Sequence, residues 1–179
     1  MDKKFHTYLC GPMEAVREKE ATNWRDKVTP KLVEIFKDQI EIVDPCKTEG
    51  EKVASVLPAE MGMDDVKEKI KGWKRSGAWD KFDIAMGAIE KADLAAVAQS
   101  TFILAFVDFN VIMGGTLDEI KAARDQKIPV YIVTYSAISE ANSWNVYKCR
   151  MASPHLKLYE SFAQALAAIE ADYKEKLCA

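Results

Sequence analysis

Short apolar segments alternate along the chain with longer segments in which apolar residues recur at every third or fourth position. The short segments have the length and composition of β-strands and cover residues 5–10, 40–43, 101–109, 129–134 and 156–159. The longer segments have helical spacing and cover residues 16–36, 78–98, 116–126 and 162–177. Strands that alternate with helices are typical of a parallel sheet covered by helices.

The pattern therefore predicts an α/β, doubly wound, mainly parallel five-stranded sheet of the flavodoxin or Rossmann type. Residues 46–77 mix glycine, proline and many charges, which indicates a long loop with at most a helical piece. Residues 139–151 are interpreted as a second connecting loop, and Thr29-Pro30 predicts a kink or restart in the first helix. A length of 179 residues with 49% apolar composition suits one domain over residues 1–179.

Composition and charge narrow the possible partners. A formal net charge of -3 and a pI near 5.5 disfavour a long nucleic acid, and no apolar run reaches the roughly 18 to 20 residues that span a bilayer. The N-terminus shows no signal peptide, so a cytoplasmic location is expected. Only two histidines are present and no Cys-x-x-Cys pair, so neither a metal nor another cofactor is expected. Free thiols are predicted at Cys10, Cys46, Cys149 and Cys178.

Ligands of such sheets bind where the carboxyl ends of the strands meet. The most informative turn follows the most apolar strand, where Gly114 and Gly115 leave the backbone bare and Thr116 opens a helix that carries Glu119. This arrangement would hold a carboxylate beside a ligand. The same Thr-x-x-Glu spacing also fits a capping box, in which Glu119 merely bonds the backbone amide of Thr116.

A second carboxylate, Asp93, lies among small apolar residues in the helix before the central strand. A buried charge there would cost several kcal/mol without a partner. Asp93 is therefore either a functional group or a residue exposed on the outer face of its helix.

Three motifs in order resemble the nucleoside 2-deoxyribosyltransferase family and the related 2-deoxynucleoside 5-monophosphate N-glycosidases. They are Thr7-Tyr8-Leu9-Cys10-Gly11, Asp93-Leu94-x-x-Val97 and Gly115-Thr116-x-x-Glu119, and the resemblance runs from about residue 5 to residue 134. It implies cleavage or transfer of the N-glycosidic bond of a deoxynucleoside or its monophosphate.

The resemblance also implies roles for single residues. Glu119 would be the nucleophile that forms a covalent glycosyl ester, Tyr8 would orient it, and Asp93 would hold the leaving base and help to protonate it. Apolar surroundings are expected to keep Asp93 partly protonated for that purpose. Residues near the motifs are expected to bind substrate, namely Gly11, Gly114, Gly115 and Thr116. Family members usually assemble, so a homo-oligomer with shared active sites is expected.

One position departs from the family pattern. The transferases usually have Asp, and the monophosphate N-glycosidases Ser, six positions before the nucleophile, where this chain has Met113. Asp108 and Asn110 are possible substitutes for the missing anchor. A cationic segment before the Asp93 helix indicates phosphate binding by Lys74 or Arg75, and Trp144 could cover the base.

Two other functions remain open from the sequence. The segment from Gly114 to Glu119 is also similar to the glycine-rich signature of cytokinin-activating phosphoribohydrolases, although the fuller pattern and an upstream Arg are missing. A non-catalytic nucleotide-binding or sensing module on the same fold is the alternative from a different class.

Overall fold

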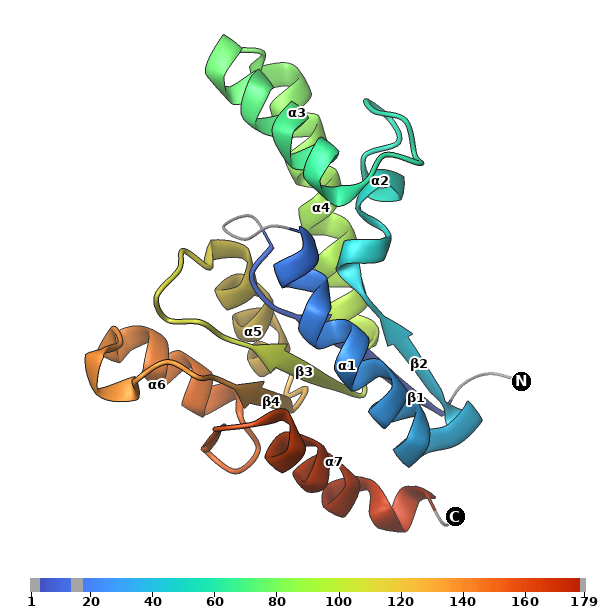
Figure 1. The fold of residues 1–179 in the computed structure, drawn as a ribbon, viewed down its shortest axis with the longest axis vertical. Helices are drawn as coiled ribbons and strands as arrows, with labels where there is room; N and C mark the ends of the chain where they lie inside the picture. The colour runs from blue at the N-terminus through green and yellow to red at the C-terminus, as the bar shows by residue number, and fades with distance from the viewer. Residues whose placement is uncertain (1–3, 14–17, 178–179) are drawn as a thin grey trace.

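The computed structural model describes residues 4–13 and 18–177. Five strands form one sheet in the order β2-β1-β3-β4-β5, and every pair of neighbours is parallel (Figure 1). The strands are β1 (Phe5–Cys10), β2 (Ile40–Val43), β3 (Phe102–Phe106), β4 (Val130–Val133) and β5 (Leu158–Tyr159). The predicted α/β fold with a doubly wound parallel sheet is confirmed.

Helices cover both faces of the sheet because successive strand side chains point to opposite sides. Phe5 and Leu9 of β1 pack with α1 (Glu18–Phe36) and α7 (Phe162–Leu177) on one face. Tyr8 and Cys10 pack on the other face, which is covered by α4 (Trp79–Gln99), α5 (Gly114–Asp125) and α6 (Ser143–Ala152). Residues i and i+2 of β1 therefore reach the same helices.

Two segments interpreted as loops contain helices. Residues 46–77 form a 3₁₀ turn at Pro45–Lys47, the short helix α2 (Glu49–Lys52) and the longer helix α3 (Met63–Ser76). The apolar spacing of Met63, Val66, Ile70 and Trp73 is helical, but it is short and its neighbours are charged. Residues 139–151 likewise contain most of α6. Further 3₁₀ turns lie at Lys37–Gln39 and Ile138–Glu140.

The expected restart at Thr29-Pro30 does not occur, because α1 runs through Pro30. The Thr29 hydroxyl donates to the carbonyl of Arg25 at 2.8 Å. Arg25 itself is fully buried, and its guanidinium donates to the carbonyls of Leu9 and Gly11, each at 3.2 Å. Asp44, after β2, lies 3.5 Å from the same guanidinium. Arg25 thus fixes the carboxyl end of β1, where the first family motif ends.

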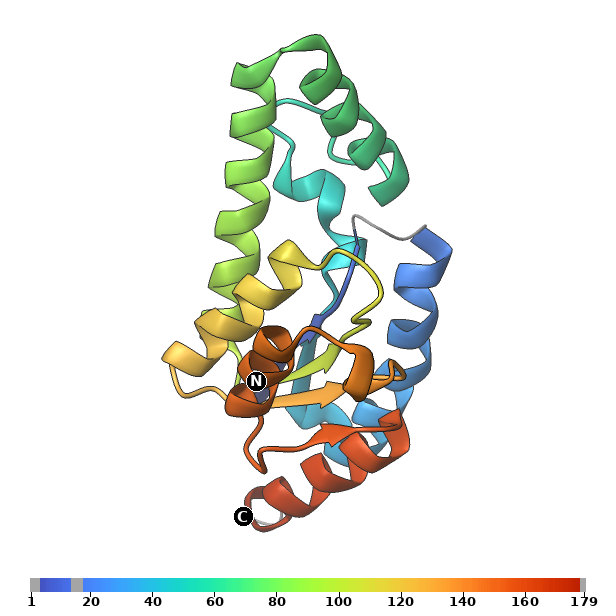
Figure 2. The same ribbon diagram turned by 90° about the vertical axis from the view of Figure 1, so that its left-hand side faces the viewer.

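Helices α3 and α4 form an arm that extends beyond the sheet (Figures 1 and 2). A small separate cluster holds it together, with Val53, Val66 and Ala85 buried at its centre. Gly77 ends α3 in the left-handed conformation, with φ of 74°, and the chain turns back into α4. Among the described residues no helix is long and apolar enough to cross a membrane.

The predicted free cysteines are confirmed where the structure describes them. Cys10, Cys46 and Cys149 are buried free thiols. Cys178 lies outside the described residues.

Candidate active site

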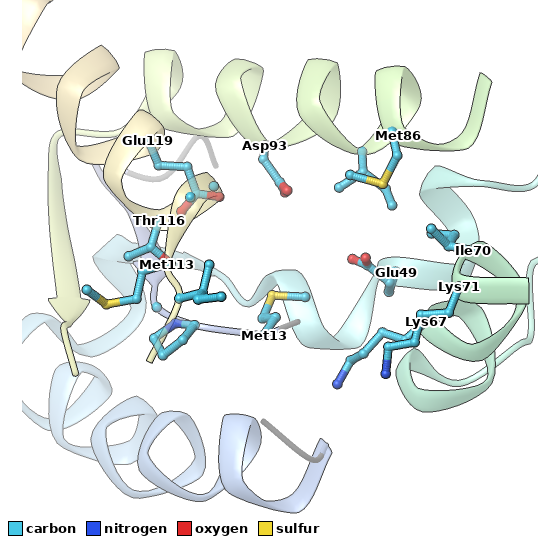
Figure 3. Close-up of a pocket in the computed structure, with 16 residues that line it drawn as sticks. Met13, Glu49, Lys67, Ile70, Lys71, Met86, Asp93, Met113, Thr116 and Glu119 are labelled. Atoms are coloured by element: carbon cyan, nitrogen blue, oxygen red, sulfur yellow. The ribbon is translucent and has the colours of Figure 1, made fainter. Parts of the chain in front are cut away.

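A pocket of about 180 Å³ opens at the carboxyl ends of β1 and β3. These neighbouring strands connect to partners in opposite directions, since β1 leads to β2 on one side and β3 to β4 on the other. Such a switch point is where doubly wound sheets bind ligands. The pocket wall comes from the turn after β1, from α2, α3 and α4, and from the start of α5 (Figure 3).

Glu119 lies in the wall of this pocket with its carboxylate held by two donors. The Tyr8 hydroxyl donates to Oε1 at 2.9 Å, and the Cys10 thiol donates to Oε2 at 2.9 Å. Both donors project from the same face of β1, and the sheet register fixes them. The carboxylate is therefore oriented by two side chains of a strand that is hydrogen-bonded to a neighbour on each side.

The capping-box interpretation of Glu119 is not supported. Helix α5 begins at Gly114, with Met113 as its N-cap, so Thr116 already lies inside the helix. No side chain caps the helix, and both oxygens of Glu119 bond to β1. Glu119 has turned inward, to the sheet and the pocket, instead of back to its own backbone.

The pKa of Glu119 is raised to about 7. Burial is the main cause and the charge of Asp93 adds to it, while the hydrogen bonds from Cys10 and Tyr8 act in the opposite direction. Burial, followed by the charge of Glu119, also raises the pKa of Tyr8 and of Cys10 well above their usual ranges. The phenol and thiol therefore stay protonated at neutral pH and act as donors.

Asp93 lies in the same wall as part of an ion-pair network. Its Oδ1 lies 2.7 Å from the Nζ of Lys52, which also donates to Oε2 of Glu49 at 3.0 Å. All three side chains are largely buried. Burial lowers the pKa of Lys52, but the charges of Glu49 and Asp93 outweigh it and the pKa rises. The apolar surroundings expected around Asp93 are thus replaced by a fixed ammonium group.

The predicted backbone contacts of the pocket are in place. Gly11, Gly114, Gly115 and Thr116 all line it. A Cβ on Gly114 or Gly115 would meet nothing within 4 Å, so the backbone there is bare. At Gly11 a Cβ would lie 3.1 Å from the Trp24 ring and 3.2 Å from the Phe106 carbonyl, so tight packing favours glycine.

Five residues predicted to bind substrate do not line this pocket, namely Lys74, Arg75, Asp108, Asn110 and Trp144. Asp108 instead accepts hydrogen bonds from Asn110 in its own loop and from Ser136 in the loop after β4. Trp144 is 63% exposed on α6, where it stacks on Tyr147 at 5.5 Å between ring centroids. Met113, at the departure from the family pattern, does line the pocket.

Among the described residues, the cations that line the pocket are Lys71 and Lys67, about one and two turns before Lys74 and Arg75 on α3 (Figure 3). Both belong to the cationic segment noted in the sequence, but the phosphate contact was assigned to Lys74 or Arg75. The segment was taken as a loop, and the pattern of a loop does not show which of its charges point the same way. Glu49 and Lys52 were missed for the same reason. Cys10 was noticed, but as a small buried residue, since its partner Glu119 is remote in sequence.

No protein-family model matches the chain, and a search of curated proteins finds no relative. The site is therefore interpreted from its own geometry.

Proposed function

We propose that this protein cleaves or transfers the N-glycosidic bond of 2-deoxyribonucleosides or their 5-monophosphates, with Glu119 as the nucleophile. The observation that carries the proposal is the carboxylate of Glu119, which is half-buried, accepts two hydrogen bonds and opens to a pocket that Asp93 also lines. Resemblance of the surrounding motifs to the nucleoside 2-deoxyribosyltransferase family supports the same chemistry.

In the proposed reaction an oxygen of Glu119 attacks C1 of the deoxyribose as the bond to the base breaks. Positive charge develops on the sugar ring, and the nearby carboxylate stabilises it before the ester forms. The base leaves with the electrons of the broken bond. It takes up a proton through Asp93, which lines the pocket, and solvent resupplies that proton while the ammonium of Lys52 holds Asp93 at 2.7 Å. Water or a second base then displaces Glu119, with net retention at C1.

The donors on Glu119 serve the proposed attack in two ways. They stabilise the ionised carboxylate, which is the reactive form, against the cost of its burial. They also fix its orientation, because Tyr8 and Cys10 hold one oxygen each. A nucleophile held in position before the substrate arrives needs no reorganisation during the reaction.

A screen for released base tests the proposal. The four common deoxynucleosides and their monophosphates are incubated with the protein, with and without a second free base, and the products are separated by chromatography. Free base alone indicates hydrolysis, and a new nucleoside indicates transfer. If no substrate releases base while calorimetry shows binding, the site belongs to a nucleotide-binding module. Ribonucleoside monophosphates are included in the same screen, and release of base from these alone would favour the phosphoribohydrolase alternative.

A further inference from the structure

Between Glu119 and the lysines of α3, the pocket wall holds a second carboxylate beside Asp93 (Figure 3). Glu49 lines the pocket from α2, and Asp93 lines it from α4, so that the two carboxylates face the same space (Figure 3). Lys52 does not line the pocket, although it bonds one oxygen of each. The ammonium thus sits behind the two carboxylates and holds them together.

The other oxygens are left for a ligand. No described residue donates a hydrogen bond to Oδ2 of Asp93 or to Oε1 of Glu49. The two bonded oxygens lie 3.0 Å and 2.7 Å from a single nitrogen, so the two carboxylates are neighbours in the pocket wall and one ligand can contact both.

Local packing fixes Glu49 in place. A Cβ on the next residue, Gly50, would lie 2.4 Å from the carbonyl oxygens of Ala59 and Met61, so the loop can close over α2 only because Gly50 has no side chain. Glu49 is itself buried, with a side chain only 7% exposed. A buried carboxylate that faces a pocket increases the affinity for a ligand that places a hydrogen-bond donor against it and lowers the affinity for one that places an acceptor there.

We propose that Glu49 is a specificity residue that selects bases carrying an exocyclic amino group beside the ring nitrogen that Asp93 contacts. The inference rests on the proposed function and names its substrate class. Adenine and cytosine present an amino donor next to an unprotonated ring nitrogen. The amino group of such a base can donate a hydrogen bond to Glu49. The ring nitrogen beside it can take up, at Asp93, the proton that the leaving base needs. Hypoxanthine and uracil place a carbonyl oxygen at the amino position, against the carboxylate of Glu49.

Two matched pairs of substrates test the inference, deoxyadenosine against deoxyinosine and deoxycytidine against deoxyuridine, each also as the 5-monophosphate. Within each pair the amino member should have the higher kcat/KM, by roughly tenfold to a hundredfold, which is the usual value of a hydrogen bond to a charged group. Glu49→Gln supplies an amide N–H that can donate to a carbonyl. Glu49→Gln should therefore lower the ratio of kcat/KM between the amino member and the keto member by that factor.

A matched control is Glu51→Gln, which removes an exposed carboxylate from the same short helix and should leave both ratios unchanged. Equal kcat/KM values within the pairs, or a loss in Glu49→Gln that affects both members equally, would overturn the inference and leave the proposed function intact. Calorimetry of the same substrates with the Glu119→Ala variant measures the selectivity of binding in the absence of catalysis. Preferential binding of the amino members by Glu119→Ala, with no base released by the unmodified protein, would keep the inference and overturn the proposed reaction.

Discussion

The two ends of the pocket are built in different ways. At the sheet end, Glu119 is held by Tyr8 and Cys10 of the central strand β1, whose backbone is bonded on both sides. At the arm end, Lys67 and Lys71 extend from α3, which packs on α4 and α2 around a small apolar cluster of its own. One end is fixed by the core of the fold, and the other belongs to a projecting hairpin of helices.

This difference assigns different tasks to the two ends. Bond cleavage requires reacting groups held to within a fraction of an ångström, which the sheet end provides. Recognition of a phosphate tolerates long side chains that adjust, and it gains from partly exposed charge. We therefore expect substitutions at the sheet end to affect kcat and those at the arm end to affect substrate preference.

The largest effect is expected for Glu119→Ala, which removes the proposed nucleophile. We expect the rate of base release to fall at least about a thousandfold. The neighbouring Asp118 is exposed on the outer side of α5, and Asp118→Ala should retain normal turnover. Initial rates from chromatography check both variants. Near-normal turnover of Glu119→Ala would remove Glu119 from the mechanism.

A comparison of two lysines should show the same contrast in stability. Lys52→Met leaves Glu49 and Asp93 buried without their counter-ion, and we expect the free energy of unfolding to fall by about 3 to 5 kcal/mol. Lys71 pairs with Glu68, and their side chains are 45% and 63% exposed, so Lys71→Met should cost less than about 1 kcal/mol. Urea denaturation at pH 7 measures both. Equal losses would mean that an exposed pair on α3 stabilises the fold as much as the two buried pairs of Lys52.

The same contrast explains what the sequence predicted well. Strand β1 and the turn before Glu119 stand out because apolar strands and their end turns are local patterns, whereas Tyr8 and Asp93 were proposed from the resemblance of the short motifs around them. The sequence bounds of β1 and β2 agree with the structure, and the three residues come together as the strand order requires. By contrast, α3 is stabilised by packing against α4. Few apolar residues within α3 itself indicate this contact. Its facing residues, Lys67 and Lys71, could be chosen over Lys74 and Arg75 only once the helix was known.

Phosphate preference is the next effect in size, and it tests the arm end. Lys67 and Lys71 line the pocket, so we expect the double change to Met to lower the preference for a monophosphate over its nucleoside roughly tenfold to a hundredfold. Lys74 and Arg75 lie outside the pocket, and their double change to Ala is the matched control with no expected effect on this ratio. The kcat/KM ratio of deoxynucleoside and monophosphate is measured for all three proteins. A loss in the control alone would return phosphate binding to the end of α3.

The smallest effect concerns the pH dependence set by Cys10 and Tyr8. If Glu119 must be ionised to attack, kcat/KM should rise with pH through its pKa of about 7. The Cys10 thiol stabilises the ionised form, so Cys10→Ala should move this rise to higher pH by up to about one unit, as should Tyr8→Phe. Cys10→Ser keeps a donor and should stay near the original profile.

Asp93 acts in the opposite sense, because its charge raises the pKa of Glu119, so Asp93→Asn should move the rise to lower pH. A general loss of packing would lower activity at every pH without these opposite displacements, and a profile that is the same in Cys10→Ala and Asp93→Asn would mean that the rise belongs to another group.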